Sequence, residues 1–231
     1  MVAATPVSRT SSYLGWLGTL PKRGARRASG ARKHLTPGHR LVALTFDDGP
    51  DWQFTPAILD VLREAHVPAT FFMVGRRARQ FPDVARRVVD EGHAVGSHSD
   101  GHPDMWALSA RAAMAEYIAG RREVESVVGR PVTLFRPPNT AIPPAHAPAL
   151  RFSRLRPWVV SLDSLDWQPG ATSESIAGNV ANPRDGEVIL FHDGLEGALS
   201  QSAEDRSATV EALPLVIEAI RRRGFGFSRL Y

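Results

Sequence analysis

The chain has 231 residues, 43% of them hydrophobic, which is enough for one sizeable core and makes a single domain the default expectation. It contains no cysteine, so disulfides and thiolate metal sites are excluded and any metal must be bound by His, Asp or Glu. The net charge of +4 is uneven: residues 1–40 carry eight Lys or Arg and no acid, whereas residues 41–231 carry 20 basic and 24 acidic side chains, so nucleic acid is not an expected partner of the body.

Residues 1–40 are rich in Ala, Gly, Ser and Arg without a clear period, which predicts a basic, weakly ordered N-terminal arm. Its apolar stretch, YLGWLGTL at 13–20, is short, broken by two glycines and followed by most of the basic residues, so it makes a poor secretory signal. No apolar run approaches the roughly 18 residues of a spanning helix. We therefore expect no transmembrane segment and, without an export signal, a cytoplasmic location.

From residue 41 onward, short apolar runs alternate with longer amphipathic segments. Strands are expected at 41–46, 69–74, 93–97, 132–135, 158–162, 187–191 and 225–230. Helices are expected at 55–65, 82–91, 109–128, 173–181 and 205–223, the first with Thr55 as its N-cap. The proline-rich segment 137–157 is expected to be a loop with little helix. This order predicts one α/β domain over 41–231 with a mainly parallel sheet, either a barrel or open.

Unusual polar residues follow most of the expected strands, at the point where each strand ends. They are Asp47 and Asp48, His98 and His102, Arg136, Asp163 and Asp166, and His192 and Asp193. In parallel α/β folds the carboxyl ends of the strands share one face, and sites are built there. Each cluster alone could be an ordinary turn or a solvated strand end, but one convergent site explains all of them.

The adjacent acids of TFDDGP and the histidines of HSDGH indicate a metal site. Two neighbouring carboxylates are costly to bury unless a cation or water compensates them. The spacing of His98 and His102 also occurs on zinc-protease helices, but the Gly and Pro around them favour a loop, and no Glu follows the first His as a base. Alone, this pair is more simply two surface histidines. Beside Asp47 and Asp48, two imidazoles and one carboxylate make a common divalent-ion site.

The segment FRPPN at 135–139 has an equally simple explanation, a proline-stiffened turn with Arg136 in solvent. Next to an acidic cluster, however, Arg136 is better interpreted as a bidentate partner that fixes one carboxylate and lowers its pKa. We therefore expect Arg136 to lie inside the site.

Five motifs in this order resemble the polysaccharide deacetylases (NodB-homology domain, carbohydrate esterase family 4). They are TFDDGP at 45–50, HSDGHP at 98–103, FRPP at 135–138, DSLDW at 163–167 and LFH at 190–192. The resemblance covers about residues 40–231. It implies a distorted (β/α) barrel of about seven strands and a metal-dependent hydrolase. Its expected substrate is an acetylated glycan or amino sugar, with N-acetyl groups removed from chitin oligomers or peptidoglycan, or O-acetyl groups from xylan.

The resemblance also implies a role for individual residues. The metal would be held by Asp48, His98 and His102. Zinc is the expected ion, although cobalt, nickel or manganese would fit the same ligands. Catalysis would use Asp47 as general base, His192 as general acid, Arg136 to orient Asp47, and Asp166 to orient and tune His192. Substrate contacts would come from Pro138, Asn139, Trp167 and Leu190.

Two departures from the family pattern concern the substrate and the location. Asn139 stands where the family usually has an aromatic residue, and Thr140 stands where it usually has a glycine. The sequence also lacks an export signal, whereas family members that act on cell-wall glycans are normally secreted. Three alternatives stay open: an acetyl-ester or small-molecule amide hydrolase, a non-catalytic carbohydrate-binding relative, and a protein whose basic arm binds nucleic acid or another anionic polymer. The sequence gives no indication of oligomeric state.

Overall fold

The computed structural model describes residues 21–194 and 205–231. Its strands are β1 (Leu41–Asp47), β2 (Ala69–Met73), β3 (Ala94–Ser97), β4 (Leu134–Phe135), β5 (Arg156–Pro157), β6 (Leu162–Asp163), β7 (Val188–His192) and β8 (Gly226–Phe227). Seven follow the order β5-β4-β3-β2-β1-β7-β6, β8 also pairs with β1, and the paired strands run parallel. The sheet curls into a half-barrel, which confirms the expected distorted (β/α) barrel.

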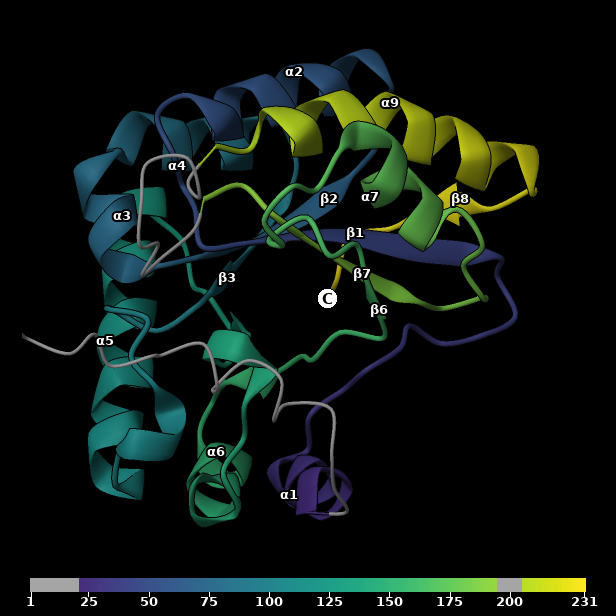
Figure 1. Ribbon diagram of the computed structural model, residues 1–231. Helices are drawn as coiled ribbons and strands as arrows, with labels where there is room; N and C mark the ends of the chain where they lie inside the picture. The colour runs from purple at the N-terminus through teal and green to yellow at the C-terminus, as the bar shows by residue number, and fades with distance from the viewer. Residues whose placement is uncertain (1–20, 195–204) are drawn as a thin grey trace, which may run out of the picture.

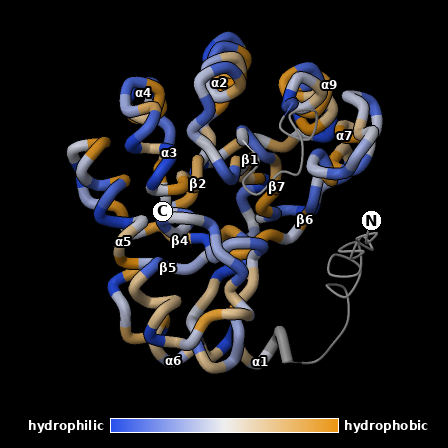
Figure 2. Tube along the Cα trace, turned by 60° about the vertical axis from the view of Figure 1, so that its left-hand side comes forward, coloured by the Kyte–Doolittle hydropathy of each residue, from blue (hydrophilic) through white to orange (hydrophobic). Residues whose placement is uncertain are grey.

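Helices surround this sheet on its outer side. They are α1 (Pro21–Ser29), α2 (Phe54–Glu64), α3 (Gly75–Gln80), α4 (Pro82–Asp90), α5 (Ala110–Val128), α6 (Ala147–Phe152), α7 (Ser173–Val180) and α9 (Ser207–Arg222). In Figure 1, α2 and α9 lie above the strands, whereas α1 and α6 lie below them. Figure 2 shows the helices as an arc around the strands. Among the described residues, none of these helices has the length and apolar character needed to span a bilayer.

Strand β1 is buried on both faces, and its alternating side chains separate two environments. Leu44 and Phe46 belong to the main core, which also contains buried side chains of α2 and α9. The intervening Ala43 packs on the other side with Phe72. Since side chains alternate along a strand, Asp47 follows the Ala43 side. The acid is thereby directed into the half-barrel and away from the helices.

The structure corrects several local predictions. The expected strand 158–162 does not form: β5 ends before it, β6 begins at its last residue, and the stretch between them is irregular. The short helices α3 and α6 were not expected, and α6 lies within the proline-rich segment predicted to be a loop. Thr55 is not the N-cap of α2, because Gln53 occupies that position; Thr55 is fully buried inside the helix and donates a hydrogen bond to Asp193 (2.6 Å).

Of the arm expected over residues 1–40, residues 1–20, including YLGWLGTL, lie outside the described residues. Helix α1 packs against α6, and the chain then forms isolated bridges from Arg32 to Trp158 and from His34 to Glu187. The Leu35 side chain is buried with Trp158. Residues 32–35 therefore connect the β5 side of the sheet to the start of β7.

Candidate active site

The polar residues predicted to converge do lie together, at the carboxyl ends of the strands. Register explains this: Asp47, at the end of β1, lies opposite His192 at the end of β7. His98 directly follows β3, and its backbone N–H donates to the Met73 carbonyl at the end of β2 (2.8 Å). Arg136 follows β4, and its N–H donates to the Ser97 carbonyl of β3 (3.0 Å). One edge of the sheet thus carries both acid and base candidates.

Asp48, His98 and His102 form a compact group of possible metal ligands. Their ligand atoms all lie within 4.8 Å of one another, and both histidine Nε2 atoms are 3.3 Å from Asp48 Oδ1. His98 Nδ1 lies 2.7 Å from the Arg136 carbonyl oxygen, which can only accept a hydrogen bond, so Nδ1 carries the proton and Nε2 is left with its lone pair. Two imidazoles and a carboxylate in this arrangement fit a divalent cation.

The protonation states of Asp48 and His102 also suit a bound cation. Burial would raise the pKa of Asp48, but the neighbouring imidazoles of His102 and His98 hold it well below its usual range. Burial lowers the pKa of His102, which keeps its imidazole neutral. Burial would do the same to His98, but Asp47 and Asp48 together outweigh burial and raise its pKa, so a cation bound there would have to displace the proton that these two acids favour. An ionised carboxylate and a neutral imidazole are the protonation states that metal ligation requires.

Asp47 is held by Arg136 from inside the half-barrel. Arg136 is completely buried, and its Nη1 donates to Asp47 Oδ1 (2.7 Å) and to Thr45 Oγ1 (2.9 Å). The expected bidentate pairing is wrong, since Nε and Nη2 have no hydrogen-bond partner among the described residues. The guanidinium instead lies over the Phe72 ring, 4.2 Å from its centre. Asp47 Oδ1 is therefore fixed by the Arg136 guanidinium, and Asp47 Oδ2 is left for other partners.

His192 and Asp166 form the second acid–base pair of the site. Asp166 Oδ1 lies 2.7 Å from His192 Nδ1, and Asp166 Oδ2 accepts the His192 backbone N–H (2.8 Å). Burial disfavours the imidazolium, but the Asp166 carboxylate outweighs burial and raises the pKa of His192 to about 9. His192 therefore favours its charged form at neutral pH.

Helix α9 supplies two residues of this network that the sequence did not reveal. The Thr209 hydroxyl donates to Asp166 Oδ2 (3.0 Å), and Arg206 donates to the Asp166 carbonyl oxygen (2.9 Å). Both side chains are buried. They lie about 40 residues from Asp166 in a segment without a motif, so no sequence signal could have identified them.

Asp193 is a further buried acid beside the site. Its carboxylate accepts hydrogen bonds from the Gly49 N–H (3.1 Å) and the Thr55 hydroxyl (2.6 Å), which anchors the loop that follows Asp47 and Asp48. A Cβ on Gly49 would lie 2.0 Å from Asp193 Oδ2, so this close approach requires glycine. Burial raises the pKa of Asp193 to about 7. From the sequence, Asp193 was expected only as one of the polar residues that follow the strands.

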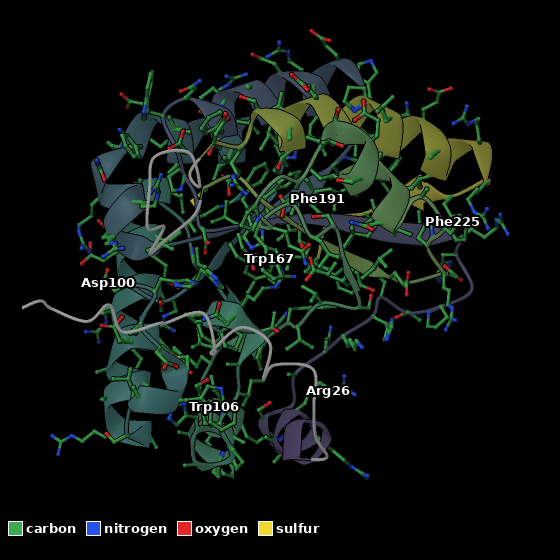
Figure 3. The ribbon with its side chains drawn as sticks, in the orientation of Figure 1. Arg26, Asp100, Trp106, Trp167, Phe191 and Phe225 are labelled. Atoms are coloured by element: carbon green, nitrogen blue, oxygen red, sulfur yellow. The ribbon has the colours of Figure 1, made fainter. Side chains whose placement is uncertain are left out.

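The expected substrate-contacting residues frame the same edge. Pro138 and Leu190 are buried, Trp167 is partly buried, and Asn139 is exposed. The Trp167 indole N–H donates to Asp163 (3.4 Å), and Figure 3 places Trp167 near the centre of the molecule. Asn139 has a left-handed φ of 53°, which Asn tolerates. The next residue, Thr140, also has a positive φ, of 50°, and this is strained for a β-branched residue.

A sequence profile described as polysaccharide deacetylase matches residues 34–157, more than half of the chain. This chain belongs to the polysaccharide deacetylase family. A relative of this deacetylase, the chitooligosaccharide deacetylase of Azorhizobium caulinodans, is 32% identical over 87% of this chain and 98% of its own. The recognition from five motifs is confirmed, and the family is one of hydrolases.

Solved structures support the same assignment. A peptidoglycan N-acetylglucosamine deacetylase in complex with a substituted benzamide superposes with a TM-score of 0.83 and 29% identity, covering 91% of this polysaccharide deacetylase and 95% of the solved chain. A family 4 acetyl xylan esterase from Clostridium thermocellum in complex with a cobalt ion gives a TM-score of 0.70 and 33% identity, covering 82% and 87%. Relatives of one fold are thus named for amide and for ester substrates.

Proposed function

We propose that this chain is a metal-dependent deacetylase that removes N-acetyl groups from N-acetylglucosamine-containing glycans, such as chitin oligomers or peptidoglycan. One cluster with three parts carries this proposal. The first part is the ligand group Asp48, His98 and His102. The other two are the Asp47 carboxylate, fixed by Arg136, and the charged imidazole of His192, held by Asp166. The names of the relatives supply the substrate class.

The metal would be held by the carboxylate of Asp48 and the Nε2 atoms of His98 and His102. Zinc is the ion we propose; cobalt suits the same ligands, and a relative was solved with it. A divalent cation bound there would polarise the acetyl carbonyl and lower the pKa of a nearby water.

Asp47 and His192 would divide the proton transfers. Asp47, oriented by Arg136, accepts a proton from the water that attacks the acetyl carbonyl carbon. His192, held charged by Asp166, donates a proton to the nitrogen as the C–N bond breaks, so that acetate and a free amine leave. The two groups are thereby prepared for opposite roles by environments of opposite charge.

The backbone N–H of Asn139 is a further candidate participant. Asn139 directly follows the FRPP motif and has a left-handed φ of 53°. An amide donor there would stabilise the oxyanion that forms when water adds to the carbonyl. Because this contact uses the backbone, it does not depend on the Asn side chain.

Acetate release by the purified chain tests the proposal. Chitooligosaccharides, peptidoglycan fragments, acetylated xylan and free N-acetylglucosamine are assayed with added zinc or cobalt and again with chelator. We expect chelator-sensitive release from a glycan amide. His98→Ala should lose both metal and activity, whereas His39→Ala, which alters an exposed histidine, should lose neither.

An acetyl ester is the second candidate substrate, favoured by the likeness to the acetyl xylan esterase and by the site's capacity for either bond. Release from acetylated xylan alone would select this alternative. Turnover unaffected by chelator, with no bound metal detected in the active protein, would contradict metal dependence for either substrate.

A further inference from the structure

A basic pocket lies between α1 and α6, within the layer below the strands in Figure 1. Its volume is about 180 Å³, and its lining includes Arg32, Arg151 and Arg156. Since a water molecule occupies roughly 30 Å³ of liquid, the pocket has room for a group several times larger than one water. None of the residues proposed for the active site lines it.

The layer formed by α1 and α6 is positively charged on both sides of the pocket, because both of its sequence stretches lack acidic residues. Residues 1–46 and residues 126–162 contain no Asp or Glu, and the lining residues 29–32 and 151–157 come from these two stretches. The fold packs one acid-free stretch against the other, because α1 contacts α6. Positive charge is thus concentrated here although residues 41–231 are net negative.

The three arginines are available to a ligand. All are exposed, and none forms an ion pair with a carboxylate among the described residues. By contrast, Arg77 and Arg87 on other helices pair with Asp51 and Asp60. Guanidinium groups that lack internal partners and face a shared cavity are suited to an oxyanion, which they can bind through paired N–H donors.

Local packing holds two of these side chains at the pocket. Arg32 lies over the Trp158 ring, 5.6 Å from its centre, and its backbone N–H donates to the Pro157 carbonyl (2.9 Å). Arg151 lies beside Gly30, where an added Cβ would be 3.4 Å from its Nη1. Gly30 has a φ of 75°, so the chain turns tightly under the guanidinium. Ordered donors lose less conformational entropy when they bind a ligand.

An exposed aromatic residue and a further arginine lie on the two helices beside the pocket. The Phe152 side chain is 90% exposed and follows Arg151 on α6. Arg26, labelled in Figure 3, lies in the last turn of α1. An exposed aromatic ring beside several cations is the combination that favours the interface of an anionic membrane.

We propose that this pocket binds a phosphoryl oxyanion, carried either by a soluble phosphate or by an anionic lipid headgroup. Binding would be independent of the deacetylase reaction, because the pocket shares no residue with the active site.

Two binding assays on the full chain test this proposal and distinguish the sources. Inorganic phosphate is titrated by calorimetry, and co-sedimentation compares vesicles of phosphatidylcholine with vesicles that also contain phosphatidylglycerol. We expect R32Q/R151Q/R156Q to weaken binding by about tenfold or more, given about tenfold for each lost charged hydrogen bond. R63Q/R86Q/R222Q removes the same charge from exposed arginines on α2, α4 and α9 and should bind as the unaltered chain does.

The outcomes are separable. Saturable phosphate binding lost in the first variant supports a soluble ligand, and binding to anionic vesicles that is lost in that variant and weakened by Phe152→Ser supports a headgroup. No binding in either assay, or equal loss in both triple variants, would overturn the proposal. Single Arg151→Gln and Arg156→Gln variants keep the test valid if the triple variant unfolds. Acetate release from a short oligosaccharide should be unchanged throughout, so a failed deacetylase assay does not affect the result.

Discussion

Charges are arranged differently at the carboxyl edge of the sheet and in the layer of α1 and α6. At the edge, buried Asp47 is paired with buried Arg136, and buried Asp166 is paired with His192. In the layer, Arg32 is exposed and has no carboxylate partner among the described residues. A buried charge needs a nearby opposite charge to offset its lost hydration, whereas an exposed one does not. The edge is therefore a coupled network in which single changes should have large effects, and the layer is a surface on which they should not.

The largest effect is expected where one member of a buried pair is neutralised. Asp47→Asn removes the proposed base and leaves the buried Arg136 without its counter-charge. We expect turnover to fall by about a thousandfold, within the range for a lost general base. Bound metal, measured by elemental analysis, should be retained.

The matched control for this change is Asp83→Asn, which makes the same replacement on an exposed side chain of α4 and should be silent. An Asp47→Asn protein that keeps more than a small fraction of its activity would refute the base assignment.

A smaller effect, which depends on the leaving group of the substrate, is expected when the proposed general acid His192 is removed. His192→Ala should reduce turnover of an N-acetyl glycan by about a hundredfold, because the amine leaving group needs a proton. An activated ester such as 4-nitrophenyl acetate should suffer less, since its leaving group departs as an anion. Equal losses on both substrates, measured side by side, would argue against the general-acid role.

A third change tests how far the network extends beyond the reacting groups. Gly120 lies on α5, and a Cβ there would be 2.1 Å from the Ser99 carbonyl carbon, in the loop between His98 and His102. Gly120→Ala must displace that loop, and we expect metal affinity to fall about tenfold to a hundredfold, as for other outer supports of metal ligands.

Gly178→Ala provides the control, because Gly178 lies in α7, where a Cβ would meet no atom within 4 Å, and the change adds only helix propensity. Metal titration of both variants decides the matter: unchanged affinity in Gly120→Ala would show that the loop does not need this contact.

The smallest expected effect is a shift in pH dependence. Asp166 raises the pKa of His192 to about 9, so the imidazole stays protonated, and activity persists, until the pH rises through that value. In Asp166→Asn the carboxylate is lost, and the pKa of His192 falls toward the ordinary 6.5. The alkaline limit of the rate profile should move to lower pH, with about a tenfold loss at pH 7.5 relative to the unaltered chain. A profile that keeps its alkaline limit would mean that another group sets it.

The site was predictable from the sequence to the extent that its residues follow strands. Asp47, His98 and His192 stand next to clear apolar runs, so their convergence followed from parallel topology. Arg206 and Thr209 could not be found in this way, because they reach Asp166 from a distant helix through tertiary packing alone. Thr55 shows the opposite error. The local sequence predicted that Thr55 would be a helix N-cap, but its hydroxyl donates a hydrogen bond to Asp193 instead.

The fold was least predictable between β4 and β7. Proline-rich sequence was interpreted as loop, yet prolines also fit the first turn of a helix, as Pro148 does in α6. The apolar run at 158–162 was expected to be one strand. Instead Trp158 forms a β-bridge with Arg32, which lies in the N-terminal segment, and no local sequence pattern predicts this partner.

The path of residues 32–41 has a consequence for the order of folding. The Gly38 N–H donates to Asp185, 147 residues later in the chain, and His34 bridges to Glu187. Contacts between such distant positions cannot form until most of the polypeptide has been synthesised, and they are slow to close. Among the first described residues to emerge from the ribosome, these would be among the last to reach their partners. Until then, the surface of Trp158 that packs with Leu35 would stay exposed, and exposed apolar surface of this kind promotes aggregation during folding.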